Sequence, residues 1–182
     1  MAGRRLAGVL ARDLLSMLVG LAVLAAFGEA FFSPVRVTGH SMEPALFDGD
    51  LVLLNRVDYR LHPPRRGDIV ILTGPQDATQ DFVKRIIGLP GDHVLIKGGF
   101  VYIDDHQLRE SYLGRPWTQT TTWPSTAFSP ADGEVVPADN FFVLGDNRDH
   151  SGDSRLFGYV SVSQILGRVV ARVFPRVSTL GS

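Results

Sequence analysis

Cysteine is absent from this chain of 182 residues, which excludes a cysteine nucleophile, a thiolate metal site and disulfide bonds. A large excess of one charge is also absent: the formal net charge is −1, so nothing points to a nucleic-acid partner. Lysine is scarce, because only Lys84 and Lys97 are lysines among 18 Lys and Arg residues. A chain that uses arginine almost everywhere can retain lysine where loss of a proton is needed, although genome composition alone would also favour arginine.

One long apolar run is present, from Leu14 to Phe32, and it covers 19 residues with two polar interruptions. As a helix it spans about 28 Å, close to the bilayer core of about 30 Å. Arg4, Arg5 and Arg12 precede it, so the positive-inside rule predicts a cytoplasmic N-terminus at 1–13, a transmembrane helix at 14–32 and an extracytoplasmic body. A cleaved signal peptide and a buried soluble helix are the alternatives.

After the apolar run, from about residue 34 to 182, the pattern changes to short apolar runs separated by Gly, Pro and Asp. Many short strands joined by such turns predict a mainly β fold, an antiparallel barrel or sandwich. Residues 111–133 show no clear period and are expected to form a long loop or a small cap. We expect strands at residues 35–40, 50–54, 68–73, 81–87, 93–97, 100–103, 141–144 and 168–174.

A serine stands at the end of the first expected strand, in Gly39-His40-Ser41-Met42-Glu43-Pro44. Gly39 permits a tight backbone and Pro44 ends the strand, which leaves the Ser41 hydroxyl near free backbone N–H groups. These are the parts of a nucleophile with an oxyanion hole. A serine in a structural turn is the more common reason for such a stretch, and Gly-x-Ser-x-Gly is not present.

Lys84 lies in the apolar stretch Phe82-Val83-Lys84-Arg85-Ile86-Ile87. On a strand, Phe82, Lys84 and Ile86 share one face and the residues between them share the other. If the Lys84 face is buried, desolvation lowers the pKa of its amine and favours the neutral form, which can act as a base. The opposite register, with Lys84 in solvent, fits the pattern equally well.

A polar stretch from Gly145 to Arg155 holds three Asp, two Ser, two Arg, one Asn and one His. A solvated turn and a polar network that supports a site are the two interpretations. The spacing does not fit a calcium loop and H-E-x-x-H is absent, so no metal and no other cofactor is expected. His40, His93 and His150 are alternative bases, although His40 should point away from the serine beside it.

Taken together, these stretches resemble the bacterial type I signal peptidase (leader peptidase) family, in its short form with a single membrane anchor. The motifs near Lys84 and at 145–155 are the most specific. The resemblance runs in order over nearly the whole chain: the apolar segment, Val37-Thr38-Gly39-His40-Ser41-Met42-Glu43-Pro44-Ala45-Leu46, Arg66-Gly67-Asp68-Ile69-Val70, Lys84-Arg85-Ile86-Ile87-Gly88-Leu89-Pro90-Gly91-Asp92, and Gly145 through Arg155.

The resemblance implies a serine endopeptidase that removes signal peptides from exported preproteins at the outer face of the cytoplasmic membrane. Its expected fold is an antiparallel β catalytic core after one transmembrane helix, with the phospholipid membrane and preproteins as partners. Ser41 matches the family nucleophile and Lys84 its general base. The sequence gives no indication of an oligomeric state.

The resemblance also implies supporting roles. Ser151 matches the serine that hydrogen-bonds the lysine amine, and Asp153 and Arg155 match an ion pair behind the site. Three residues beside the nucleophile and the base would line shallow apolar pockets for small side chains at the −1 and −3 positions of the substrate; they are Val37, Met42 and Phe82.

This chain departs from the family pattern at two positions. Gly39 stands where some members carry a serine whose hydroxyl helps to form the oxyanion hole, so the oxyanion would depend more on the Ser41 N–H. Ala45 stands where threonine is usual, and little change is expected because both are small. The 111–133 region is also much shorter than the second domain of the long members.

Three other hypotheses fit parts of the sequence. A Ser–Lys protease that cuts itself, like the SOS-repressor cleavage domain, is opposed by the membrane segment and by the 145–155 motif. A processing peptidase restricted to one pilus or conjugation substrate shares the same residues. A membrane-anchored β-domain that binds leader peptides without cutting them would have no need of the complete catalytic set.

Overall fold

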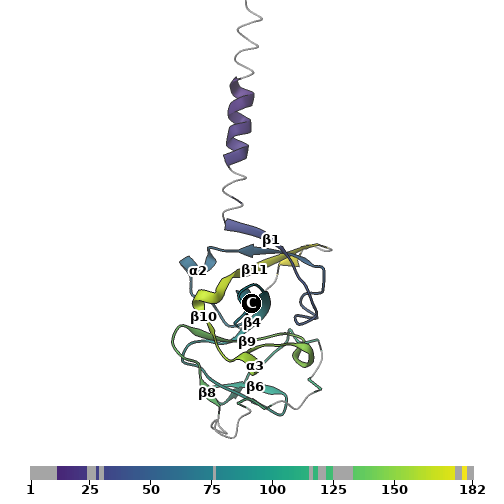
Figure 1. The fold of residues 1–182 in the computed structure, drawn as a ribbon, viewed down its shortest axis with the longest axis vertical. Coiled ribbons are helices and arrows are strands. Elements are labelled where there is room, and N and C mark those ends of the chain that lie inside the picture. Colours follow the sequence, from purple (N-terminus) through teal and green to yellow (C-terminus); the bar gives the residue numbers. More distant parts are fainter. Residues whose placement is uncertain are drawn as a thin grey trace, which may run out of the picture.

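Two antiparallel sheets carry the fold, as the computed structural model shows (Figure 1). The structure describes residues 12–23, 28, 31–75, 77–114, 117–118, 122–124, 133–174 and 178–179. The larger sheet has the order β1-β2-β11-β3-β4-β9-β10, with β12 paired to β11. The smaller has the order β7-β6-β5-β8 and lies at the end of the β body away from β1 (Figure 1).

The larger sheet consists of β1 (Phe32–Arg36), β2 (Leu51–Asn55), β3 (Ile69–Thr73), β4 (Asp81–Gly88), β9 (Asn140–Leu144), β10 (Val160–Ser161), β11 (Ile165–Phe174) and β12 (Ser178–Thr179). The smaller sheet consists of β5 (His93–Lys97), β6 (Phe100–Ile103), β7 (His106–Gln107) and β8 (Glu134–Val135). The helical turns are α2 (Asp58–Leu61), η1 (Arg148–His150), α3 (Ser154–Phe157) and η2 (Val162–Gln164).

The expected strands are all present, and the first is displaced toward the N-terminus. Instead of 35–40, β1 covers Phe32–Arg36 and pairs with β2, with Phe32 opposite Asn55. The strand ends early because the chain turns at Gly39, whose φ of 91° only glycine adopts without strain. Phe32, expected at the end of the membrane segment, is therefore the first residue of the β body.

The apolar segment is described in part, at residues 12–23 and 28, and 24–27 and 29–30 lie outside the described residues. Residues 12–23 form a helix, drawn in purple in Figure 1. Its large apolar side chains are exposed, as at Leu15 and Met17. Within the described ranges, no helix has both the length and the apolar character needed to cross a membrane.

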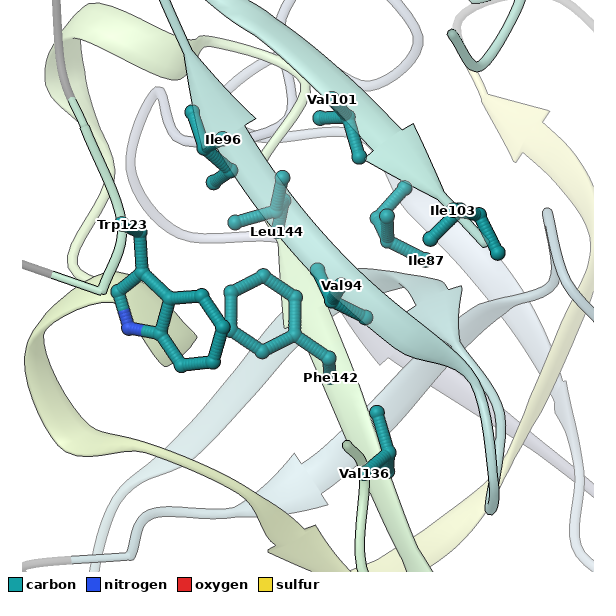
Figure 2. Close-up of a cluster of buried hydrophobic side chains, with 9 residues drawn as sticks. All are labelled: Ile87, Val94, Ile96, Val101, Ile103, Trp123, Val136, Phe142 and Leu144. Carbon is teal, nitrogen blue, oxygen red and sulfur yellow. The ribbon is translucent and has the colours of Figure 1, made fainter. Parts of the chain in front are cut away.

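One hydrophobic cluster joins the two sheets (Figure 2). Phe142 of β9 packs against Trp123, with ring centroids 4.5 Å apart, beside Val94 of β5. The backbone of Trp123 also forms a β-bridge with Ile96. Part of the expected 111–133 loop is thus fixed to the core, while 115–116, 119–121 and 125–132 lie outside the described residues.

Strand β4 is buried on both faces in its second half. Ile86 packs in the cluster under β3 and β9, and Ile87 packs in the cluster between the sheets. Lys84 and Arg85 are consequently both buried, although they point to opposite faces. The alternative with Lys84 on a buried face is confirmed and the one with Lys84 in solvent is wrong, and the face of Arg85 is covered as well. Two cations in the core need either partners or loss of charge.

Candidate active site

Ser41 and Lys84 meet in space although 43 residues separate them in the chain. The Lys84 ammonium Nζ donates a hydrogen bond of 2.9 Å to the Ser41 hydroxyl Oγ. Lys84 projects from β4, where it lies opposite Val70 of β3, and Ser41 lies in the turn after β1. The serine and the lysine expected to react together are therefore in contact.

The turn that carries Ser41 is held at both ends by hydrogen bonds. Before the serine, the Gly39 N–H donates to the Asp48 carboxylate at 2.8 Å. At the serine, the Asn147 N–H donates to the Ser41 carbonyl at 2.9 Å. The Asn147 side-chain amide donates to the His40 carbonyl at 3.0 Å. Because these bonds use backbone groups, they fix the turn without occupying the serine hydroxyl.

The backbone N–H of Ser41 donates to no acceptor among the described residues. It is therefore available to a substrate oxygen, which is the role of an oxyanion-hole donor. The Gly39 N–H is already committed to Asp48, and glycine has no hydroxyl to add. Position 39 therefore adds no side-chain donor to this turn.

The surroundings of Lys84 favour the neutral amine. Burial lowers the pKa of Lys84 to about 8, since only 3% of the residue is exposed and the charged form loses its hydration. The Asp153 carboxylate opposes this shift, the Arg155 guanidinium adds to it, and Asp146 opposes it more weakly. No carboxylate in the described part of the chain forms an ion pair with Lys84.

Asp153 and Arg155 form a bidentate ion pair behind the site. Arg155 Nε and Nη2 lie 2.8 Å from the two carboxylate oxygens of Asp153, which is fully buried. Asp153 also accepts the N–H of Gly145 at 3.0 Å. Such pairing is rigid and directional, so the two residues hold the turn after β9 in one position.

Ser151 differs from the expectation. Its hydroxyl oxygen is buried and has no hydrogen-bond partner among the described residues, so the bond to the Lys84 amine is not formed here. A side-chain carbon at Gly145 would lie 2.2 Å from this hydroxyl and 2.5 Å from the Ser41 carbonyl oxygen. Ser151 thus packs against the Gly145 backbone, and position 145 has no room for a side chain.

Two buried ion pairs were not foreseen as parts of the site. Arg85, the neighbour of the buried lysine, pairs with Asp146 through bonds of 2.8 and 2.6 Å. Arg148 pairs with Glu110, which comes from a segment that the sequence left without a role. Arg85 stands in a largely apolar strand, and a charged residue in such a strand was a signal that it has a buried partner. No local pattern indicated the second.

The expected substrate-binding residues lie close to the site at different depths. Val37 and Met42 are in the core cluster, 3% and 1% exposed, while Phe82 is half-buried and stacks on Phe157. A cavity of about 330 Å³ is lined by other residues, including Pro44 and Trp117. Two of the three expected residues are therefore packed in the core, and Phe82 is partly exposed.

All five histidines lie in the described part of the chain, and none forms a hydrogen bond with Ser41. His40 contacts Glu43 at 2.8 Å, and this carboxylate raises the pKa of His40. His150 lies 3.3 Å from the Asn147 side chain. The side chain that hydrogen-bonds the Ser41 hydroxyl among the described residues is therefore a lysine and not a histidine.

Comparisons with known proteins point in one direction. Residues 10–174 match the family model described as signal peptidase, peptidase S26. The signal peptidase I of Leptolyngbya laminosa is 39% identical over 172 residues, 90% of this chain and 79% of that protein. The signal peptidase I of Bacillus caldolyticus is 38% identical over 162 residues, 86% and 87% of the two chains. The crystal structure of a signal peptidase I from Enterococcus faecalis V583 is 34% identical, with a TM-score of 0.50, over 59% of this chain and 97% of that one.

The protonation of Lys84 can be measured directly, because Lys97 is the only other lysine. In protein labelled with ¹³C at lysine Cε, we expect two resonances and a Lys84 titration midpoint at about 8, set by burial of the amine. The Lys84→Arg variant assigns the resonance by removing it. A midpoint near the ordinary lysine value of about 10.4 would show that burial does not lower the pKa of Lys84.

Proposed function

This chain belongs to the signal peptidase family, peptidase S26, and we propose that it cleaves signal peptides from exported preproteins with Ser41 as nucleophile and Lys84 as general base. The observation that carries the proposal is the 2.9 Å contact between Ser41 Oγ and the buried amine of Lys84. A serine hydroxyl is a weak nucleophile until a base takes its proton.

The pKa of Lys84 makes it a usable base near neutral pH. A pKa of about 8 leaves about a tenth of the amine neutral at pH 7, whereas an ordinary lysine with a pKa of about 10.4 leaves about 0.04%. The neutral amine accepts the Ser41 proton across the contact that the charged amine makes as donor. Below pH 8 the rate should fall about tenfold per pH unit as the amine becomes protonated.

The reaction then proceeds in two stages. Ser41 Oγ bonds to the scissile carbonyl carbon while its proton moves to Lys84, and the Ser41 N–H stabilises the negative oxygen. The peptide C–N bond breaks as Lys84 returns the proton to the leaving amine, which leaves the signal peptide as an ester on Ser41. Water, with Lys84 again as the base, hydrolyses the ester and restores both residues.

Small residues at the −1 and −3 positions of the substrate suit the shallow surface beside Ser41. An extended peptide points alternate side chains toward the same wall, so these two positions face the enzyme together. Val37 and Met42 form a floor that is already packed, and Phe82 stands beside it. A large side chain would need space that these residues occupy.

We place the catalytic domain on the outer side of the cytoplasmic membrane, with the apolar segment from Leu14 to the start of β1 at Phe32 as its anchor. Support comes from the exposed apolar side chains of residues 12–23, which are unfavourable in water and favourable in lipid. Arginines at positions 4, 5 and 12 favour a cytoplasmic N-terminus. A preprotein held in the same membrane would present its cleavage site at the outer face.

The dyad is tested by replacing each lysine in turn. Lys84→Arg should lower kcat for preprotein cleavage by about 100-fold or more, because arginine keeps the charge and cannot give up a proton. The matched control is Lys97→Arg, at an exposed position of β5, which should cleave at the unmodified rate. Ser41→Ala should be inactive, whereas His40→Ala and His150→Ala should retain activity. Turnover by folded Lys84→Arg at the unmodified rate would exclude the proposed base.

The shallow surface is tested on the substrate side. Leu in place of Ala at −1 should lower kcat/KM by about 10- to 100-fold, as forcing extra methylenes into a packed site does. Leu at −2 is the control, since that side chain points away from the wall and should be tolerated. Equal cleavage of the Ala and Leu substrates at −1 would mean that Val37, Met42 and Phe82 do not limit the site.

The topology is tested in intact cells and in spheroplasts. Protease added outside spheroplasts should degrade the β body, because residues 34–182 are expected on the outer side. A cytoplasmic marker protein must survive in the same sample. Full protection of the chain until the cells are lysed would contradict the proposed orientation.

A further inference from the structure

The segment after β7 reaches the candidate site through a buried ion pair. Glu110 Oε2 lies 2.9 Å from Arg148 Nη1, and its other oxygen contacts Arg148 Nη2. The two side chains are only 9% and 2% exposed. The Tyr112 hydroxyl donates at 2.7 Å to the same Glu110 oxygen that contacts Arg148 Nη2. A charged pair so well buried leaves an uncompensated charge if one partner is removed.

The same segment covers the arginines with an aromatic ring. The guanidinium carbons of Arg148 and Arg155 lie 4.7 and 5.4 Å from the centre of the Trp117 ring, within the range of a cation–π contact. The next residue, Thr118, donates its hydroxyl to the Asp149 carboxylate at 2.8 Å. Arg148 is therefore held by a carboxylate, a ring and its own backbone turn.

Arg148 also hydrogen-bonds the peptide group of Gly145, which packs against Ser41. Its Nε donates to the Gly145 carbonyl at 3.0 Å, and its own carbonyl accepts from Arg155 at 2.7 Å. The Gly145 N–H is bound by Asp153 at 3.0 Å. Both polar groups of Gly145 are thus fixed, and Gly145 is the residue that packs against the Ser41 carbonyl oxygen.

The segment also contacts the Ser41 turn directly. The backbone of Gly114 approaches the Pro44 ring closely enough that a side-chain carbon there would lie 2.8 Å from it. A cavity of about 330 Å³ is lined by Pro44 and Phe47 of the turn, by Gly114 and Trp117 of the segment and by residues 146–149. The ion pair of Glu110 with Arg148 connects the segment to the polar motif that holds Gly145.

We propose that Glu110 is a positioning residue of the reaction: through Arg148 it fixes Gly145 against the backbone of Ser41 and so sets where the nucleophile stands relative to Lys84. Glu110 touches no reacting atom. The inference rests on the proposed function, and it gives the segment at 110–118 a part in catalysis. A displacement of about 1 Å at the nucleophile is enough to cost about 100-fold in rate.

The test compares two variants of the full-length chain, each of which replaces one carboxylate by the corresponding amide. Glu110→Gln keeps the shape of the side chain and removes the charge that holds Arg148. Asp58→Asn is the matched control, because Asp58 pairs with Arg168 at 2.5 Å in the region of α2. With a peptide that carries Ala at −1 and −3, we expect Glu110→Gln to lower kcat about tenfold or more with KM within about twofold. Asp58→Asn should leave both constants within about twofold of the unmodified chain.

A double variant separates positioning from general loss of structure. If Glu110 acts only through Arg148, then Glu110→Gln with Arg148→Gln should be no slower than Arg148→Gln alone, because the coupled residues are not additive. Additive losses would overturn the proposal. So would a loss of activity in Glu110→Gln that follows a lowered Tm and disappears at low temperature.

Amide hydrogen exchange gives a measurement that needs no substrate. The Asn147 N–H, bonded to the Ser41 carbonyl, should exchange about tenfold faster in Glu110→Gln and at the unmodified rate in Asp58→Asn. Unchanged exchange together with unchanged kcat would refute the coupling. If the unmodified chain cleaved no preprotein, the proposed function would fail by itself, and the exchange rates would still decide whether Glu110 holds the Ser41 turn.

Discussion

The structure depends on burying the amine of Lys84 in a strand that is covered on both faces. Two neighbouring basic residues, Lys84 and Arg85, are buried there, and their surroundings differ. Arg85 receives the Asp146 carboxylate at hydrogen-bond distance and keeps its charge. Among the described residues, the amine of Lys84 hydrogen-bonds the Ser41 hydroxyl and no carboxylate, and burial lowers its pKa to about 8. One face of β4 therefore carries an ion pair, and the opposite face carries a buried amine that burial shifts toward the neutral form.

The charges around Lys84 act in opposite directions on its pKa, and burial sets the direction of the shift. Asp153 attracts the positive charge of the amine, and Arg155, paired with Asp153, acts against that attraction. An unpaired carboxylate at the same place would keep the lysine protonated. The Asp153–Arg155 pair thus holds the turn after β9, while its two charges shift the pKa of Lys84 in opposite directions.

Close approach of backbone is the second constraint on the site. Gly145 has no side chain because the Ser41 carbonyl and the Ser151 hydroxyl occupy that space, and Gly39 turns the chain with a φ of 91°. The charged groups of Asp153 and Arg148 bind the two polar groups of the Gly145 peptide. Packing and hydrogen bonding together fix the backbone around Ser41.

The sequence by itself determined the strands, the turn serine, the scarce lysine and the polar motif at 145–155, because each is a local pattern of period, turn residues or composition. It did not determine which face of β4 is buried, since alternation identifies faces only when one of them meets solvent, and here Lys84 and Arg85 are both covered. It also did not determine the partners of buried charges. Glu110 meets Arg148, and Ser151 packs on Gly145 instead of bonding the amine, because such contacts join segments whose approach is decided only when the two sheets pack together.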